Sequence, residues 1–174
     1  MMTATLIRDM TGLEKLFLEH YQFVYRTAYG ITGSTEDARD VLQTIFLRLL
    51  DRPQLPDLKN NAKAYLHRAA VNESLNSIQA RNRRNVTNAI ARVAAQAQSE
   101  TNEFIERLHH RLYGAMGKLD RATADILVLR YVHDYSDAEI GRLIGKPRGV
   151  VAVRLYRARA RLKTLMEQSQ DEDS

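Results

Sequence analysis

The most concentrated charged side chains lie near the C-terminal end, where basic residues recur at helical spacing. Between Arg142 and Lys163 the chain has eight Lys or Arg and no Asp or Glu. These cations bind phosphate oxygens, and arginine can also donate two hydrogen bonds to a guanine edge. A solvated surface usually mixes charges of both signs. The pattern therefore favours a surface that binds DNA; the alternative is an ordinary helical hairpin with a basic, solvated face.

A second basic stretch lies near the middle of the chain. From Lys59 to Arg92 there are seven Lys or Arg and one acid, Glu73, whereas the first fifty residues hold five bases and six acids. The formal net charge is +5 and the isoelectric point is about 9.6. Because the charge is gathered in two separated stretches, it indicates two surfaces that face an anionic partner.

The sequence contains few residues arranged for catalysis or for metal binding. The chain has no cysteine, and His109 and His110 are adjacent, so they point to different helix faces and cannot form a metal-binding pair four residues apart. The other histidines are isolated in the sequence: His20, His67 and His133. Asp37 and Asp40 share a helix face, but no nucleophile or phosphate-binding loop accompanies them. We expect no metal, no cofactor and no enzymatic activity.

The elements that must position these residues are helical throughout. Apolar residues follow three-four spacing from Leu13 to Ala28, and again after Ser34, which is expected to cap a second helix with Asp37 as its partner. Prolines at 53 and 56 mark a loop, and a third helix is expected over about 61–80. Residues 81–101 are rich in Asn, Ala, Gln and Arg, which is typical of a flexible linker.

Towards the C-terminus the pattern predicts a helix-turn-helix. Ser136 and Glu139 form a capping-box pair, and Gly145 can adopt the left-handed conformation that ends the first helix. Val151 and Leu155 would anchor the second helix, whose other residues are rich in arginine. Such a helix fits the major groove of DNA.

The predicted fold is all-α, with two small helical domains joined by a flexible linker. We expect the first domain over 1–80, the linker over 81–101 and the helix-turn-helix domain over 102–174. The N-terminus has no long apolar run, and no stretch approaches the roughly 18 apolar residues of a membrane span. The sequence therefore predicts a cytoplasmic protein without membrane insertion.

Taken together, these motifs resemble the extracytoplasmic-function group of the sigma-70 family. The resemblance rests on Tyr25–Gly33, Glu36–Leu50 and Tyr65–Asn72 in the first half. In the second half it rests on Leu119–Tyr131 and the helix-turn-helix. It implies an RNA polymerase sigma factor that binds core polymerase, reads and melts promoter DNA, and is held silent by an anti-sigma factor.

The resemblance also implies roles for particular residues. The polymerase-binding candidates lie on the second helix: Asp37, Asp40, Gln43 and Phe46. The candidates for the downstream promoter element lie on and after the third helix: Tyr65, Arg68, Asn72, Asn76, Arg81, Arg83 and Arg84. The candidates for the upstream element lie in the helix-turn-helix: Lys146, Arg148, Arg154, Arg157 and Arg161.

Some positions depart from the family pattern. Thr44 stands where an acid is frequent, Tyr65 where tryptophan is frequent, and Val150 where threonine is frequent, so one polar DNA contact is expected to be lost. Two other functions stay open: a helix-turn-helix regulator that acts without polymerase, and an adaptor that binds only protein.

Overall fold

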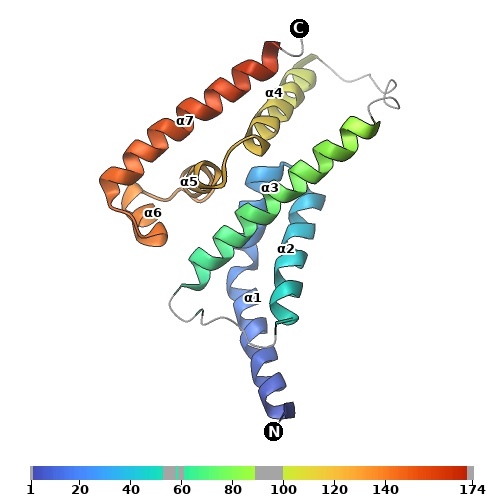
Figure 1. The fold of residues 1–174 in the computed structure, drawn as a ribbon, viewed down its shortest axis with the longest axis vertical. Helices are drawn as coiled ribbons and strands as arrows, with labels where there is room; N and C mark the ends of the chain where they lie inside the picture. The colour runs from blue at the N-terminus through green and yellow to red at the C-terminus, as the bar shows by residue number, and fades with distance from the viewer. Residues whose placement is uncertain (1, 53–57, 59–60, 89–99, 172–174) are drawn as a thin grey trace.

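The computed structural model describes residues 2–52, 58, 61–88 and 100–171, and these form seven α-helices without a strand. The side chains of 2–11, 84–88, 100–103 and 170–171 are left out of this description. The helices are α1 (Met2–Thr32), α2 (Thr35–Leu50), α3 (Ala62–Asn88), α4 (Glu100–Gly117), α5 (Arg121–Tyr131), α6 (Asp137–Ile144) and α7 (Arg148–Asp171). The predicted all-α class is confirmed (Figure 1).

The first three helices pack on one another around an apolar centre. Val24 of α1, Val41 and Ile45 of α2, and Leu66 of α3 are all nearly or fully buried there. The three-four spacing of apolar residues explains this, because it places them on one side of each helix. Ser34 caps α2 by accepting a hydrogen bond from the backbone N–H of Asp37.

The last four helices form the second unit, in which α7 packs against α4, α5 and α6. Its core includes Leu127 and Leu129 of α5, Ile140 of α6, and Val151 and Leu155 of α7. Burial of Val151 and Leu155 confirms their predicted role as anchors of the last helix.

The two units also pack against each other, which the sequence did not predict. Val71 and Ile78 of α3 belong to the same buried cluster as Leu119 and Leu127 of the second unit. In Figure 1, α5 lies between α3 and α7. Approach is close at Gly117, where an added Cβ would lie 2.5 Å from Cγ2 of Ile78.

The predicted linker falls mostly outside the described residues. Helix α3 continues past the expected end at Ala80 to Asn88, α4 begins at Glu100, and residues 89–99 between them are not described. The basic residues Arg81, Arg83 and Arg84 therefore belong to α3.

Candidate nucleic-acid interface and docking groove

The α6–α7 pair has the geometry of a helix-turn-helix. Ser136 and Glu139 form the predicted capping box, in which the Ser136 N–H donates to the Glu139 carboxylate and the Glu139 N–H donates to the Ser136 hydroxyl. Gly145 ends α6 with φ of 67°, as predicted. Gly141 leaves room for the turn, because an added Cβ would lie 2.5 Å from the carbonyl oxygen of Lys146.

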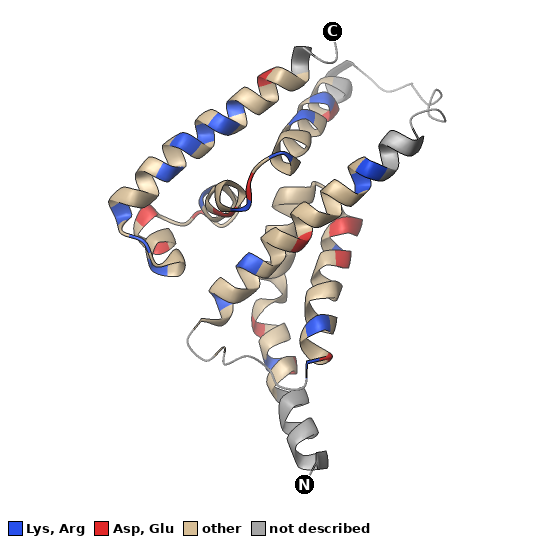
Figure 2. Ribbon diagram, viewed as in Figure 1, with Lys and Arg blue, Asp and Glu red and all other residues tan. Residues whose placement is uncertain are grey.

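Helix α7 has a buried side and a basic side. Successive residues of an α-helix are rotated by about 100°, so Arg154, Arg157 and Arg161 lie within about 60° of one another. All three are exposed, and among the described residues none accepts a hydrogen bond or ion pair from them. Figure 2 shows Lys and Arg recurring along α7. We call Arg154, Arg157 and Arg161 the arginine stripe.

The other two candidates of this helix-turn-helix lie apart from the arginine stripe. Lys146 is exposed in the turn before α7. Arg148 is exposed at the first residue of the helix, but it is rotated by at least about 120° from the stripe. The four arginines predicted to contact DNA therefore occupy two different sides of α7. They cannot all meet the same groove.

Helix α3 presents an exposed polar surface beside the side that packs against the second unit. Arg68 and Asn76 are exposed and Asn72 is partly exposed, and the three lie within about 80° of one another. Val71 and Ile78 lie about 100° and 120° around α3 from Asn72, and they are buried against the second unit. The polar side is therefore open while the two units are packed together.

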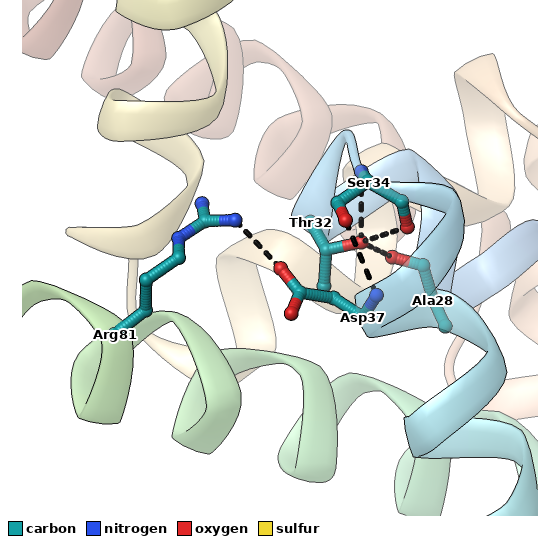
Figure 3. A network of polar contacts seen from close by, with 5 residues as sticks. All are labelled: Ala28, Thr32, Ser34, Asp37 and Arg81. Atoms are coloured by element: carbon teal, nitrogen blue, oxygen red, sulfur yellow. Dashed lines mark hydrogen bonds and ion pairs between the residues drawn. The ribbon is translucent and has the colours of Figure 1, made fainter.

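The remaining candidates of α3 are less accessible or already engaged. Tyr65 is partly buried and packs against the core of the first unit. Arg81 forms an ion pair with Asp37 of α2, with 2.6 Å between Nη1 and Oδ2 (Figure 3). Arg83 is exposed and has an interaction within the chain, and the side chain of Arg84 lies outside the described residues.

The predicted docking residues of α2 do not share one face. Residues at three-residue spacing turn by about 60° at each step, so Asp37 and Phe46 end on opposite sides of the helix. The Asp37 carboxylate forms an ion pair with Arg81. It therefore does not accept from the Ser34 backbone N–H, as the capping-box pattern predicted, although the Asp37 N–H does donate to the Ser34 hydroxyl. Phe46 is 8% exposed and packs on Phe17 of α1. Asp40 and Gln43 are exposed between them.

Phe46 forms part of an apolar groove between α1 and α2. The groove has a volume of about 590 Å³, and its apolar lining is Leu13, Phe17, Leu42, Phe46, Leu47 and Leu50. Leu47 and Leu50 are 49% and 52% exposed, and exposed apolar residues gathered in a groove mark a candidate interaction site. Sequence reasoning missed them because it assigned α2 a single apolar side. The signal was present, since Leu47 and Leu50 lie off that side.

Two histidines that are distant in sequence lie close together where the two units meet. The ring centroids of His67 and His133 are 6.1 Å apart, although the two residues are isolated from each other in the sequence. Asp125 Oδ1 lies 2.6 Å from His67 Nε2. Thr27 Oγ1 lies 2.8 Å from His133 Nε2 and donates its own proton to the Phe23 carbonyl, so the imidazole N–H donates to Thr27.

Cations surround His133 at this interface. The Arg26 guanidinium donates to the Val132 carbonyl at 2.6 Å, and Lys63 lies over the rings of Phe23 and Tyr135. Burial lowers the pKa of His133 to about 3, and the nearby His67, Arg26 and Lys63 act in the same direction. The His133 ring is therefore neutral at physiological pH.

Neither histidine belongs to a metal site in the described part of the chain. Among those residues, no three or more His, Cys, Asp or Glu side chains are grouped so that they could hold one ion. Within the same residues we find no helix long and apolar enough to cross a membrane.

Comparison with known proteins places these surfaces in a family. Residues 16–84 match sigma-70 region 2 and residues 109–162 match sigma-70 region 4. The first match contains most of the α1–α2 groove and the polar side of α3. The second contains the helix-turn-helix and the arginine stripe.

The relatives agree with these matches. The ECF RNA polymerase sigma factor SigL of Mycobacterium tuberculosis is 29% identical, over 89% of each chain. The corresponding SigE of Mycolicibacterium smegmatis is 27% identical, over 98% of this chain and 70% of that one. A solved structure of the sigma factor RpoE with the anti-sigma factor NepR from Bartonella quintana has the same fold, with a TM-score of 0.53 and 17% identity over 88% of this chain and 96% of that one. The chain belongs to the extracytoplasmic-function group of the sigma-70 family.

Proposed function

We infer that this chain is an RNA polymerase sigma factor that binds core polymerase and directs promoter-specific initiation by reading and melting promoter DNA. The observation that carries this inference is the presence of both sigma-70 regions in one chain, each with an exposed candidate interface. The activity is one of binding and DNA opening, and we propose no catalytic role. We also propose that the protein acts in the cytoplasm.

Each interface has a proposed partner. The arginine stripe contacts phosphates of the upstream element, because unpaired exposed guanidinium groups bind duplex DNA through charge. The polar side of α3 holds unpaired bases of the downstream element, since amide groups such as Asn72 can pair with base edges. We place these functions in domains 1–80 and 102–174, joined by 81–101.

The α1–α2 groove is the proposed polymerase-docking surface. Its exposed Leu47 and Leu50 supply apolar area, and Glu14, Arg39 and Gln43 supply a polar border. This combination of an apolar centre and a polar rim is typical of protein interfaces. An anti-sigma factor is a further proposed partner, because the similar solved structure contains one.

Transcription from purified components tests the function. Core polymerase and a library of promoter fragments should yield specific transcripts only when the protein is added. A helix-turn-helix regulator without a polymerase role would bind DNA but leave core polymerase inactive. An adaptor that binds only protein would show no promoter binding and no steep salt dependence.

A matched pair of variants tests the docking surface. Leu47→Asp places a charge in the groove and should weaken core binding at least tenfold, since a buried unpaired charge is costly. Leu18→Asp is the control, because Leu18 is 64% exposed on α1 and does not line the groove. Equal core affinity of the two variants would mean that polymerase docks elsewhere.

A further inference from the structure

The outer surface of α7 carries apolar side chains beside the arginine stripe. Val150 is 41% exposed and Val153 is 51% exposed. The core of the second unit is served by other residues of the same helix, Val151 and Leu155, which are 0% and 3% exposed. Val150 and Val153 are therefore not required to hold α7 in place.

The two valines continue the arginine stripe towards the start of the helix. By helical rotation Val150 lies between the directions of Arg154 and Arg157, and Val153 lies about 40° beyond Arg157. The N-terminal turns of a recognition helix are the part that meets base edges, whereas later turns rise towards the backbone. Phosphate contacts by the stripe would thus bring Val150 and Val153 to the floor of the groove.

The chemistry of valine determines what it can read there. A valine side chain has no donor or acceptor, so it cannot recognise guanine or adenine through hydrogen bonds. Its methyl groups can pack on the thymine C5-methyl, the one apolar group on a base edge in the major groove. Valine is also stiff about χ1 in a helix, so little side-chain freedom is lost on contact.

We infer that Val150 and Val153 are specificity-determining residues that read thymine methyl groups in the upstream promoter element. This inference rests on the proposed function, because it requires α7 to lie in the major groove. It differs from the predicted contact by Arg148 with the upstream element, because Arg148 lies at least about 120° from the stripe. Val150 and Arg148 cannot face the same base pairs.

Substitution of thymine by deoxyuridine isolates the methyl contact. The upstream element is first selected from a random library with core polymerase and the full chain, and each thymine of the selected element is then replaced by deoxyuridine. Loss of one packed methyl should reduce binding by about fourfold, the ratio that corresponds to about 0.8 kcal/mol. The same substitution outside the element should have no effect.

Two double variants then connect the effect to the protein. Val150→Ser with Val153→Ser removes the methyl groups and should bind thymine and deoxyuridine templates equally. Val150→Ile with Val153→Ile keeps apolar contact and should retain the discrimination. Both positions are exposed, so neither double variant should disturb the fold.

The readouts separate this inference from the proposed function. Initiation on the thymine template reports the function, and the ratio between the two templates reports the methyl contact. A wild-type protein that initiates equally well on both templates overturns the inference and leaves the function intact. Serine variants that keep the full discrimination, or that lose only affinity for core polymerase, also overturn it. A protein that initiates on no promoter refutes the proposed function, and the inference with it.

Discussion

Helices α3 and α7 carry the two proposed nucleic-acid surfaces, and they are built differently. The three cations of the arginine stripe on α7 have no acceptor among the described residues. On α3, by contrast, Arg81 is paired with Asp37 and Lys63 lies over two aromatic rings. Another side of α3 is buried against the second unit, whereas α7 lies at the edge of its own unit (Figure 1).

This difference indicates how each surface binds. A row of free guanidinium groups attracts duplex DNA over a distance and depends strongly on salt. The polar side of α3, with Arg68, Asn72 and Asn76, depends more on hydrogen bonds, which act only at short range. We therefore expect α7 to supply salt-dependent affinity, and α3 to act after binding, when bases become accessible.

The largest expected effect comes from removing the arginine stripe. Replacing Arg154, Arg157 and Arg161 by alanine should weaken upstream-element binding by about a hundredfold. The slope of log affinity against log salt concentration should fall by about three, one for each lost phosphate contact. Binding of a labelled duplex over a salt series measures both. Arg159→Ala is the control, because Arg159 lies on another side of α7 and donates to the Tyr131 hydroxyl. An unchanged salt slope in the triple variant would mean that α7 does not bind DNA mainly through charge, as we propose in contrast to α3.

A substitution on the polar side of α3 should have a smaller effect, and it should act on the rate of promoter opening. Asn72→Ala should slow promoter opening by about fivefold, because one hydrogen bond contributes about 1 kcal/mol. Closed-complex affinity and its salt dependence should stay unchanged. Permanganate reactivity of unpaired thymines follows the opening. Asn72 is a cleaner test than Tyr65, which packs against the core, so truncating Tyr65 also lowers stability. Opening at the wild-type rate would exclude a role for this side of α3.

The ion pair between α2 and α3 should have a weaker effect still. A double-mutant cycle with Asp37→Asn and Arg81→Gln should give a coupling free energy of about 0.5 kcal/mol in urea unfolding, as expected for a partly exposed pair. Asp40→Asn should show no such coupling to Arg81. This control matters because a loss of core binding in an Asp37 variant could otherwise reflect the broken pair. A coupling near zero would mean that Arg81 is free to bind DNA.

The smallest effect near neutral pH concerns the contact between the two units. The pKa of His133 is about 3 in the folded protein and about 6.5 in an unfolded chain, so the folded form binds fewer protons between these values. Its stabilising contribution is complete above pH 6.5 and decreases as the pH falls from 6.5 towards 3. Thermal unfolding from pH 8 to pH 5 should show this loss.

Two glutamine variants identify the histidine responsible. His133→Gln should make stability less dependent on pH over this range, whereas His110→Gln should not, because His110 is exposed on α4. The same pH dependence in both variants would mean that another group controls the contact. The upstream duplex should still bind through α7 at the lower pH, because the arginine stripe takes no part in that interface.

Much of this molecule could be predicted from local sequence patterns. Three-four spacing located the helices, and Ser136, Glu139 and Gly145 marked the boundaries of α6 as the structure has them. The basic side of α7 was also predictable, because residues within one helix have a known angular relation. The same relation would have shown that Arg148 and the arginine stripe lie on different sides.

Contacts between distant residues were decided only by the tertiary structure. His133 and Thr27 are 106 residues apart in the chain, and Arg81 and Asp37 are 44 apart. Apolar periodicity states which side of a helix is buried but not which helix covers it, so it predicted neither pair nor the core shared by the two units. The sequence by itself determined the helices, their caps and the basic surface, because these depend on neighbours within a few residues. Packing between helices alone decided which cations stay free to bind a partner, because an ion pair forms only where two helices bring its members together.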